Sequence, residues 1–162
     1  MHLAIDVRKA EPGNALELTA IALAAKRHWG YPEAWIQRWL DTLTITPEYI
    51  AGNATFAARD GGAILGFSAL REEAGEPWID HLWVLPAAMG RGIGRRLFER
   101  CAQEARTAGA TVLKIDADPN AKPFYRHMGA RAVDRVPAPM DEIMRFRPIM
   151  AKALKKGRRP RF

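Results

Sequence analysis

The most informative stretch of this sequence runs from Leu82 to Leu97 and has the residues LWVLPAAMGRGIGRRL. An apolar, strand-like run ends at Pro86, and three glycines then open an amphipathic helical pattern. A helix N-terminus has four N–H groups without intrahelical partners and about half a positive charge. Glycines remove the side chains that would hold a phosphate away from those donors. The stretch therefore predicts a pyrophosphate site where a strand passes into a helix.

Two other phosphate-binding motifs are excluded by spacing. The sequence has no Gly-x-x-x-x-Gly-Lys-[Ser/Thr], so a Walker phosphate loop is ruled out. Its glycines follow Gly-x-Gly-x-Gly rather than Gly-x-Gly-x-x-Gly, and no acid lies suitably at the end of a following parallel strand. Both features argue against a dinucleotide site of the Rossmann type.

A second motif, AKPFYRHMGA, covers residues 121–130. Together the two motifs resemble the GCN5-related N-acetyltransferase (GNAT) superfamily, whose pattern is a strand ending in Val-x-Pro followed by [Gln/Arg]-x-x-Gly-x-[Gly/Ala]. The second motif is similar to the family's Ala-x-x-[Phe/Leu]-Tyr-x-x-x-Gly-Phe. This chain departs from the patterns at Met89, where the family usually has Gln or Arg, and at Ala130, which replaces Phe.

The resemblance implies an α/β (α+β) fold with a mixed, mostly antiparallel central sheet flanked by about four helices. It also implies direct acetyl transfer from acetyl-CoA to a primary amine. The spacing of His, Asp and Glu residues in the sequence suggests no metal site. The acceptor would be a small-molecule or peptide amine, and a homodimer is left open. Two alternatives are a non-catalytic CoA-binding sensor and an RNA- or ribosome-associated protein.

The resemblance assigns cofactor contacts to backbone atoms of both halves of the first motif. In the strand, the atoms facing the pantetheine and the thioester would be those of Leu82, Trp83 and Val84. Around the helix start, the pyrophosphate would be held by N–H groups of Gly90, Arg91, Gly92, Ile93, Gly94 and Arg95. Guanidinium groups of Arg91, Arg95 and Arg96 would add charge, with at least one of them on a solvated helix face.

Amine acetylation needs a proton acceptor and a proton donor. An alkyl-ammonium has a pKa near 10.4, so a base must remove its proton at neutral pH. By resemblance, Tyr125 is the acid that protonates the leaving thiolate. A half-buried packing role is the alternative for Tyr125.

Asp80 is the favoured base, because the family often places an acid at that strand position. His81 is the neighbouring candidate, with an ordinary pKa near 6.5. Strand alternation predicts Asp80 on the face of Leu82 and His81 on the opposite face, with Trp83. An ordered water is a further alternative, and Glu72 and Glu73 are weaker ones.

Periodicity and breakers predict the remaining elements. Strands are expected at 3–8, 54–59, 63–70, 78–85, 112–116, 130–136 and 145–151. Helices are expected at 15–27, 92–108 and 121–127, with another carrying the apolar stripe Trp35, Trp39, Leu40 and Leu43 and ending near Thr46-Pro47. Trp29 and Tyr31, between the first two helices, would line the acceptor pocket or pack in the core. The roles of Asp118 and Asn120 stay open.

The net charge is +7, and residues 152–162 carry six of those positive charges without an acid. We therefore predict an acetyltransferase domain at 1–151 and a basic tail at 152–162. A solvated tail is favoured over one that binds nucleic acid, because no aromatic residues interleave with its charges. The sequence has no secretory signal and no apolar run near the ~20 residues of a membrane span, which favours a cytoplasmic protein. The single cysteine, Cys101, excludes an intramolecular disulfide and is predicted to be a core residue.

Overall fold

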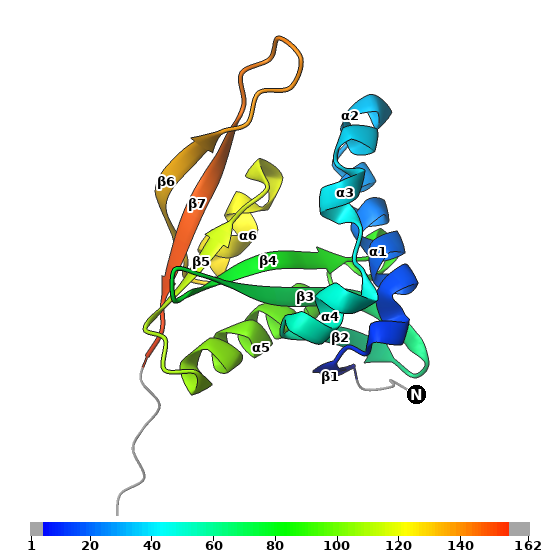
Figure 1. The fold of residues 1–162 in the computed structure, drawn as a ribbon, viewed down its shortest axis with the longest axis vertical. Helices are drawn as coiled ribbons and strands as arrows, with labels where there is room; N and C mark the ends of the chain where they lie inside the picture. The colour runs from blue at the N-terminus through cyan, green and yellow to red at the C-terminus, as the bar shows by residue number, and fades with distance from the viewer. Residues whose placement is uncertain (1–4, 156–162) are drawn as a thin grey trace, which may run out of the picture.

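The computed structural model describes residues 5–155, which form one seven-stranded mixed sheet covered by helices (Figure 1). The strand order is β1-β2-β3-β4-β5-β7-β6, and only β4 and β5 run parallel. The strands are β1 (Asp6–Lys9), β2 (Thr55–Asp60), β3 (Ala63–Glu73), β4 (Glu76–Val84), β5 (Val112–Asp116), β6 (Arg131–Pro137) and β7 (Phe146–Ala153). The α-helices are α1 (Ala15–His28), α2 (Glu33–Arg38), α3 (Leu40–Leu43), α4 (Pro47–Gly52), α5 (Ile93–Thr107) and α6 (Lys122–His127). The predicted fold class is confirmed.

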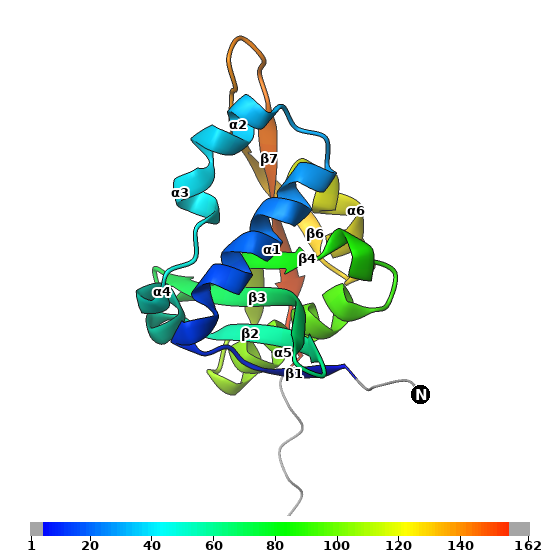
Figure 2. The same cartoon turned by 90° about the vertical axis from the view of Figure 1, so that its right-hand side faces the viewer.

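Two apolar layers lie on opposite faces of the sheet. Alternation along β2 directs Phe56 and Ala58 toward α5, and directs Ala57 toward α1. The helix α5 buries a stripe that recurs every four residues, as predicted, and Cys101 in that stripe is fully buried. Figure 2 shows α1 crossing the face of the sheet opposite α5.

Two of the differences from the predicted boundaries change where an element begins or ends by several residues. The helix α4 starts at Pro47, where the prediction placed only the end of the preceding helix. Strand β7 continues through Ala153, and the N–H of the buried Leu154 donates to the carbonyl oxygen of Thr111 at 2.8 Å, so the first residues of the predicted tail belong to the sheet. Residues 3 and 4 of the first predicted strand and residues 156–162 of the tail lie outside the described residues.

The strands β4 and β5 separate soon after they meet. Their paired residues are Trp78 with Lys114 and Ile79 with Ile115. Beyond them, the β6–β7 hairpin rises away from β4 on the same side as α2 and α3 (Figure 1), and the loop that joins β6 to β7 contacts α2 through Trp35 and Asp141. None of the helices within residues 5–155 is long and apolar enough to cross a membrane. The separation of the two strands sets the position of the candidate site.

Candidate active site

A bulge in β4 marks the point where the sheet opens. Across the β3–β4 ladder, Ala69 pairs with His81 and Leu70 pairs with Ile79, so Asp80 is the extra residue. Such a bulge bends the strand and redirects its side chains. The separation from β5 begins at this same place, next to Ile115.

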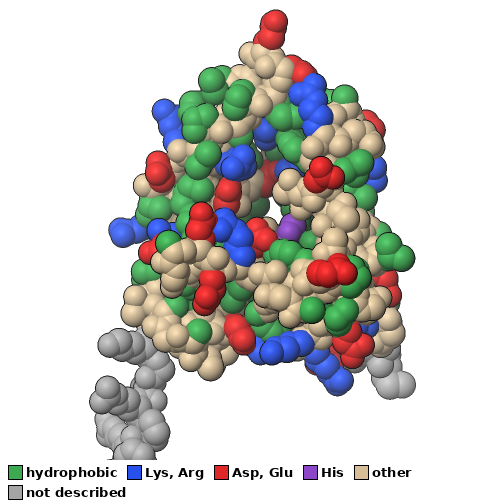
Figure 3. Space-filling view, viewed as in Figure 1, with side chains coloured by type: hydrophobic (Ala, Val, Ile, Leu, Met, Phe, Trp, Pro, Cys, Tyr) green, Lys and Arg blue, Asp and Glu red, His purple; other side chains and the backbone are tan. Residues whose placement is uncertain are grey.

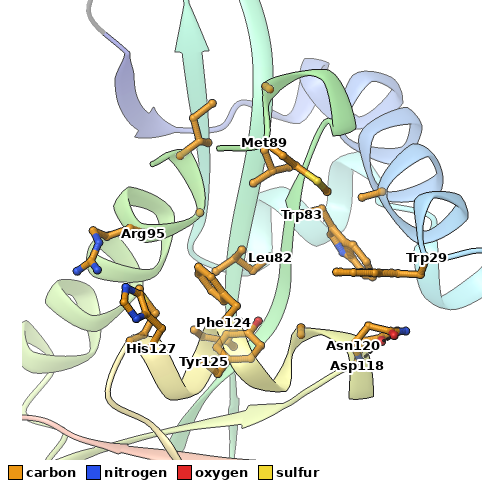
Figure 4. Close-up of a pocket in the computed structure, with 18 of the residues that line it drawn as sticks. Trp29, Leu82, Trp83, Met89, Arg95, Asp118, Asn120, Phe124, Tyr125 and His127 are labelled. Atoms are coloured by element: carbon orange, nitrogen blue, oxygen red, sulfur yellow. Dashed lines mark hydrogen bonds between the residues drawn. The ribbon is translucent and has the colours of Figure 1, made fainter. Parts of the chain in front are cut away.

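A cavity of about 410 Å³, the first cavity, lies between the open ends of β4 and β5. Eight of the nine residues predicted to hold the cofactor line it: Leu82, Trp83, Val84, Gly90, Gly92, Ile93, Gly94 and Arg95. Figure 4 shows Phe124 and Tyr125 entering from α6, Trp29 beside Trp83, and Arg95 at the end opposite Asp118.

The start of α5 is suited to an anion. Gly92 precedes the helix in the left-handed region, with φ of 77°, and no side chain of the described residues caps it. The first turn contains no acid but carries Arg95 and Arg96, although a helix N-terminus is itself positive. The unpaired N–H groups and the positive charges of the two arginines would both attract a diphosphate.

Gly94 has a second role in this segment. A Cβ atom built on Gly94 would lie 3.1 Å from Cε2 of Phe124 and 3.3 Å from its Cζ. A larger residue would therefore require the Phe124 ring to move by a few tenths of an ångström. The glycine keeps the ring of Phe124, and with it the neighbouring Tyr125, close to the helix start.

The three arginines of the motif lie in different places. Arg95 lines the first cavity. Arg91 does not, and its guanidinium pairs with Asp60 at 3.0 Å. The guanidinium of Arg96 donates to the carbonyl oxygen of Ile5. Of the three arginines, Arg95 is the one that lines the first cavity.

Tyr125 is buried on α6 between two aromatic rings. Its ring centroid lies 5.1 Å from that of Phe124 and 6.1 Å from that of Phe98. Figure 4 shows its hydroxyl directed into the first cavity toward Leu82. Burial raises the pKa of Tyr125 above its ordinary value of 10, so the hydroxyl keeps its proton at neutral pH.

A second cavity, of about 470 Å³, meets the first one. Four residues line both: Asp80, Trp83, Asp116 and Asp118. The second cavity lies between β4, α3 and the β6–β7 hairpin, and Figure 3 shows this face hollowed there, with charged side chains of both signs around the hollow. A ligand in the first cavity and a ligand in the second cavity would therefore come together beside Asp80.

The predicted face assignment holds for His81, which lies with Trp83, but it is wrong for Asp80, because it assumed a regular strand. Owing to the bulge, both side chains lie against Tyr49 of α4. The Tyr49 hydroxyl donates to Oδ2 of Asp80 at 2.5 Å, and the rings of Tyr49 and His81 are 5.6 Å apart. Arg71 donates to Oδ1 of Asp80 at 3.2 Å, so both carboxylate oxygens have a donor.

The imidazole of His81 is held by its neighbours. Nε1–H of Trp83 donates to Nδ1 of His81 at 3.0 Å, which assigns the proton of the neutral ring to Nε2. That nitrogen lies 3.8 Å from Oδ2 of Asp80. Burial lowers the pKa of His81, although the charge of Asp80 opposes the shift. His81 is therefore neutral at pH 7, and its only lone pair on nitrogen is occupied.

Asp118 is the centre of a network that joins α1 to the loop before α6. Lys26 donates to its carboxylate at 2.6 Å, the Tyr31 hydroxyl at 3.1 Å and the Asn120 backbone N–H at 2.8 Å. Burial alone would raise the pKa of Asp118, but Lys26 and these hydrogen bonds bring it below its ordinary value. Asp118 is thus a buried, paired carboxylate, and Asn120 belongs to its network through a second bond to Tyr31.

Sequence reasoning missed four residues of the second cavity and its wall: Lys26, Tyr49, Arg145 and Arg147. Tyr31 lines neither cavity and packs against Trp35 and Trp39, which matches the packing alternative given for it. Trp29 lines the first cavity instead.

The splayed sheet, the uncapped start of α5 and the two joined cavities place the chain in the class of acyltransferases that its motifs resemble. Residues 30–141 match the family model for the acetyltransferase (GNAT) domain. The chain belongs to the GNAT acetyltransferase family.

Similar proteins include an IAA acetyltransferase of Azospirillum brasilense, 39% identical over 61 residues, which are 36% of this chain and 40% of that relative. The chain thus matches less than half the length of that relative. A GCN5-related N-acetyltransferase from Rhodopseudomonas palustris has a TM-score of 0.78 and 26% identity, covering 92% of this chain and 95% of its own. The PaiA N-acetyltransferase of Thermoplasma acidophilum, solved with coenzyme A, has a TM-score of 0.76 and 18% identity, covering 93% of this chain and 99% of its own.

Proposed function

We propose that this protein transfers an acetyl group directly from acetyl-CoA to a primary amine. One observation carries the proposal: the uncapped start of α5 opens into a cavity that meets a second, charged cavity at Asp80. The first cavity would hold the cosubstrate and the second the amine. Membership of an acetyltransferase family supports the same reaction.

The chain's own residues would bind and orient the cosubstrate. Backbone N–H groups of Ile93, Gly94 and Arg95 would hold the pyrophosphate, together with the Arg95 guanidinium. Residues Leu82 to Val84 of β4 are not paired with β5, so their backbone groups are free to bind the pantetheine and thioester parts of acetyl-CoA. When bound, acetyl-CoA supplies the acetyl group as a thioester.

Two side chains would handle the protons. The Asp80 carboxylate lies where the cavities meet and would accept the proton of the incoming ammonium. His81 would serve as a positioning residue, because its Nδ1 already accepts from Trp83. The Tyr125 hydroxyl, protonated and directed into the first cavity, would donate to the departing sulfur.

The test combines binding with turnover. Calorimetry with coenzyme A should detect association, and thiol release from acetyl-CoA should rise when a panel of primary amines is added. Absence of coenzyme A binding would refute the proposal. Binding without thiol release for any amine would instead favour a CoA-binding sensor.

A further inference from the structure

The second cavity has more positive than negative side chains. Three carboxylates line it, and each has a cationic partner, although Arg71 is shared between Asp80 and Glu73. Arg71 donates to Asp80 at 3.2 Å, and Lys26 donates to Asp118 at 2.6 Å. Asp116 receives two hydrogen bonds from one guanidinium, that of Arg147, at 2.8 and 3.2 Å. Every acidic side chain that lines the cavity therefore has a cationic partner within the protein.

Arg145 is the cation that remains. It lines the second cavity and has no carboxylate within 4.0 Å among residues 5–155. Its guanidinium donates one hydrogen bond, to the Tyr31 hydroxyl at 3.1 Å. Guanidinium has five N–H donors, so most of them stay available.

Aromatic rings hold the Arg145 guanidinium in place. It lies 5.2 Å from the ring centroid of Tyr31, 5.3 Å from that of Trp35 and 5.4 Å from that of Trp39. The loop that carries Arg145 is itself fixed to α2, because Nε1–H of Trp35 donates to Asp141 at 2.9 Å. A guanidinium positioned in this way is ready to form a two-bond pair with a carboxylate.

Apolar side chains complete the wall of the second cavity. They come from α3, β4 and the loop before β7, and include Leu43, Trp83, Pro139 and Met140. A ligand that pairs with Arg145 would lay its carbon skeleton against these side chains.

We propose that the acetyl acceptor is a small amino acid, a molecule that carries its amine and a free carboxylate on an apolar skeleton. The carboxylate pairs with Arg145, and the amine lies toward Asp80. The proposal rests on the function proposed above and names its acceptor class. A polyamine or aminoglycoside fits poorly, because its extra ammonium groups would meet Arg145 and find every lining carboxylate already paired.

Matched pairs of acid and amide test the carboxylate directly. The probes are L-leucine with L-leucinamide, L-phenylalanine with L-phenylalaninamide, and 4-aminobutyrate with its amide, plus spermidine. Binding is followed by tryptophan fluorescence, since Trp39 and Trp83 line the cavity, and acetylation is followed as kcat/KM. For at least one pair, we expect kcat/KM to be about tenfold or more higher for the acid than for its amide. This is the effect of one charge-assisted hydrogen-bond pair.

Arg145→Gln should abolish that preference and leave amide binding within about twofold. Arg38→Gln is the control, because Arg38 pairs with Asp141 on the same loop but does not line the cavity. It should keep the preference, which separates recognition of charge from positioning of the loop. If both variants lose the preference for the acid equally, the proposal is overturned. Equal acetylation of acid and amide in every pair, or a preference for spermidine, would also overturn it.

The two proposals fail differently. If amides and acids are acetylated equally well, acetyl transfer stands and the amino acid acceptor is wrong. If coenzyme A does not bind, acetyl transfer is wrong, and the acceptor proposal, which rests on it, is overturned as well.

Discussion

Tyr49 of α4 donates a 2.5 Å hydrogen bond to Asp80, the extra residue in the bulge of β4. Arg71 of β3 holds the other carboxylate oxygen. Two elements thus fix one side chain at the meeting point of the two cavities. A proton acceptor held in this way needs little reorganisation when the amine arrives.

Replacing Asp80 by Asn should lower kcat/KM for amine acetylation by about 10²-fold or more, the usual contribution of a general base. Coenzyme A binding should change little, because the proposed pyrophosphate site lies at the start of α5, away from Asp80. Initial rates of thiol release and calorimetry measure the two quantities. His81→Gln is the comparison variant and should lose less activity. A larger loss for His81→Gln would transfer the role of base to the histidine.

Replacing Tyr125 by Phe should lower kcat by about 10²-fold while coenzyme A affinity stays within about twofold. The change removes only the hydroxyl, and the ring that packs against Phe98 and Phe124 is kept. The readouts are saturating rates and a calorimetric Kd. Unchanged kcat would leave Tyr125 as a packing residue.

Arg95→Gln should weaken coenzyme A binding about fivefold, because Arg95 lines the first cavity in the first turn of α5. Arg91→Gln is the matched change four residues earlier and should leave the Kd nearly unchanged, since that guanidinium pairs with Asp60. Raising the salt concentration should reduce the difference in coenzyme A Kd between the two variants. Equal effects of both substitutions would show that long-range charge, rather than a contact, holds the ligand.

The features that could be predicted from the sequence depend on local patterns. The start of α5 follows from a proline and glycines within nine residues, and its buried face follows from the spacing of apolar residues. The helix α4 was missed because Thr46-Pro47 was interpreted as an end. The Thr46 side chain instead accepts from the N–H of Tyr49 at 3.0 Å, and Pro47 occupies the first helical turn.

The site details that were missed depend on partners far away in the sequence. The bulge at Asp80 depends on how β3 pairs with β4, so alternation within β4 alone assigned Asp80 to the wrong face. The pair of Lys26 and Asp118 joins residues 92 positions apart, and the bond from Arg145 to Tyr31 spans 114 positions. No local pattern in the sequence specifies which of its many charged residues meet in this way.

Lys26→Met should destabilise the protein by about 3 kcal/mol, because it leaves the carboxylate of Asp118 buried without its cation. The two side chains are only 13% and 8% exposed, so solvent screens the pair weakly. The double variant Lys26→Met with Asp118→Asn should recover part of the loss, since no unpaired charge remains. Urea unfolding of the natural protein, Lys26→Met, Asp118→Asn and the double variant gives the coupling free energy. A coupling near zero would mean that the pair contributes little.

His81 should make the protein less stable as the pH falls below about 6.5. Burial lowers the pKa of His81 in the folded state below its ordinary value of 6.5, so the unfolded chain binds the proton more readily. Protonation then favours unfolding, beginning near the unfolded pKa and continuing down to the folded one. At pH 5.5, one unit below the ordinary value, the loss can reach about 1.4 kcal/mol. Urea unfolding at pH 7.5 and 5.5 should therefore show a larger drop for the natural protein than for His81→Gln. The same drop in both proteins would assign the acid sensitivity to other groups, because the glutamine side chain cannot take up a proton in this range.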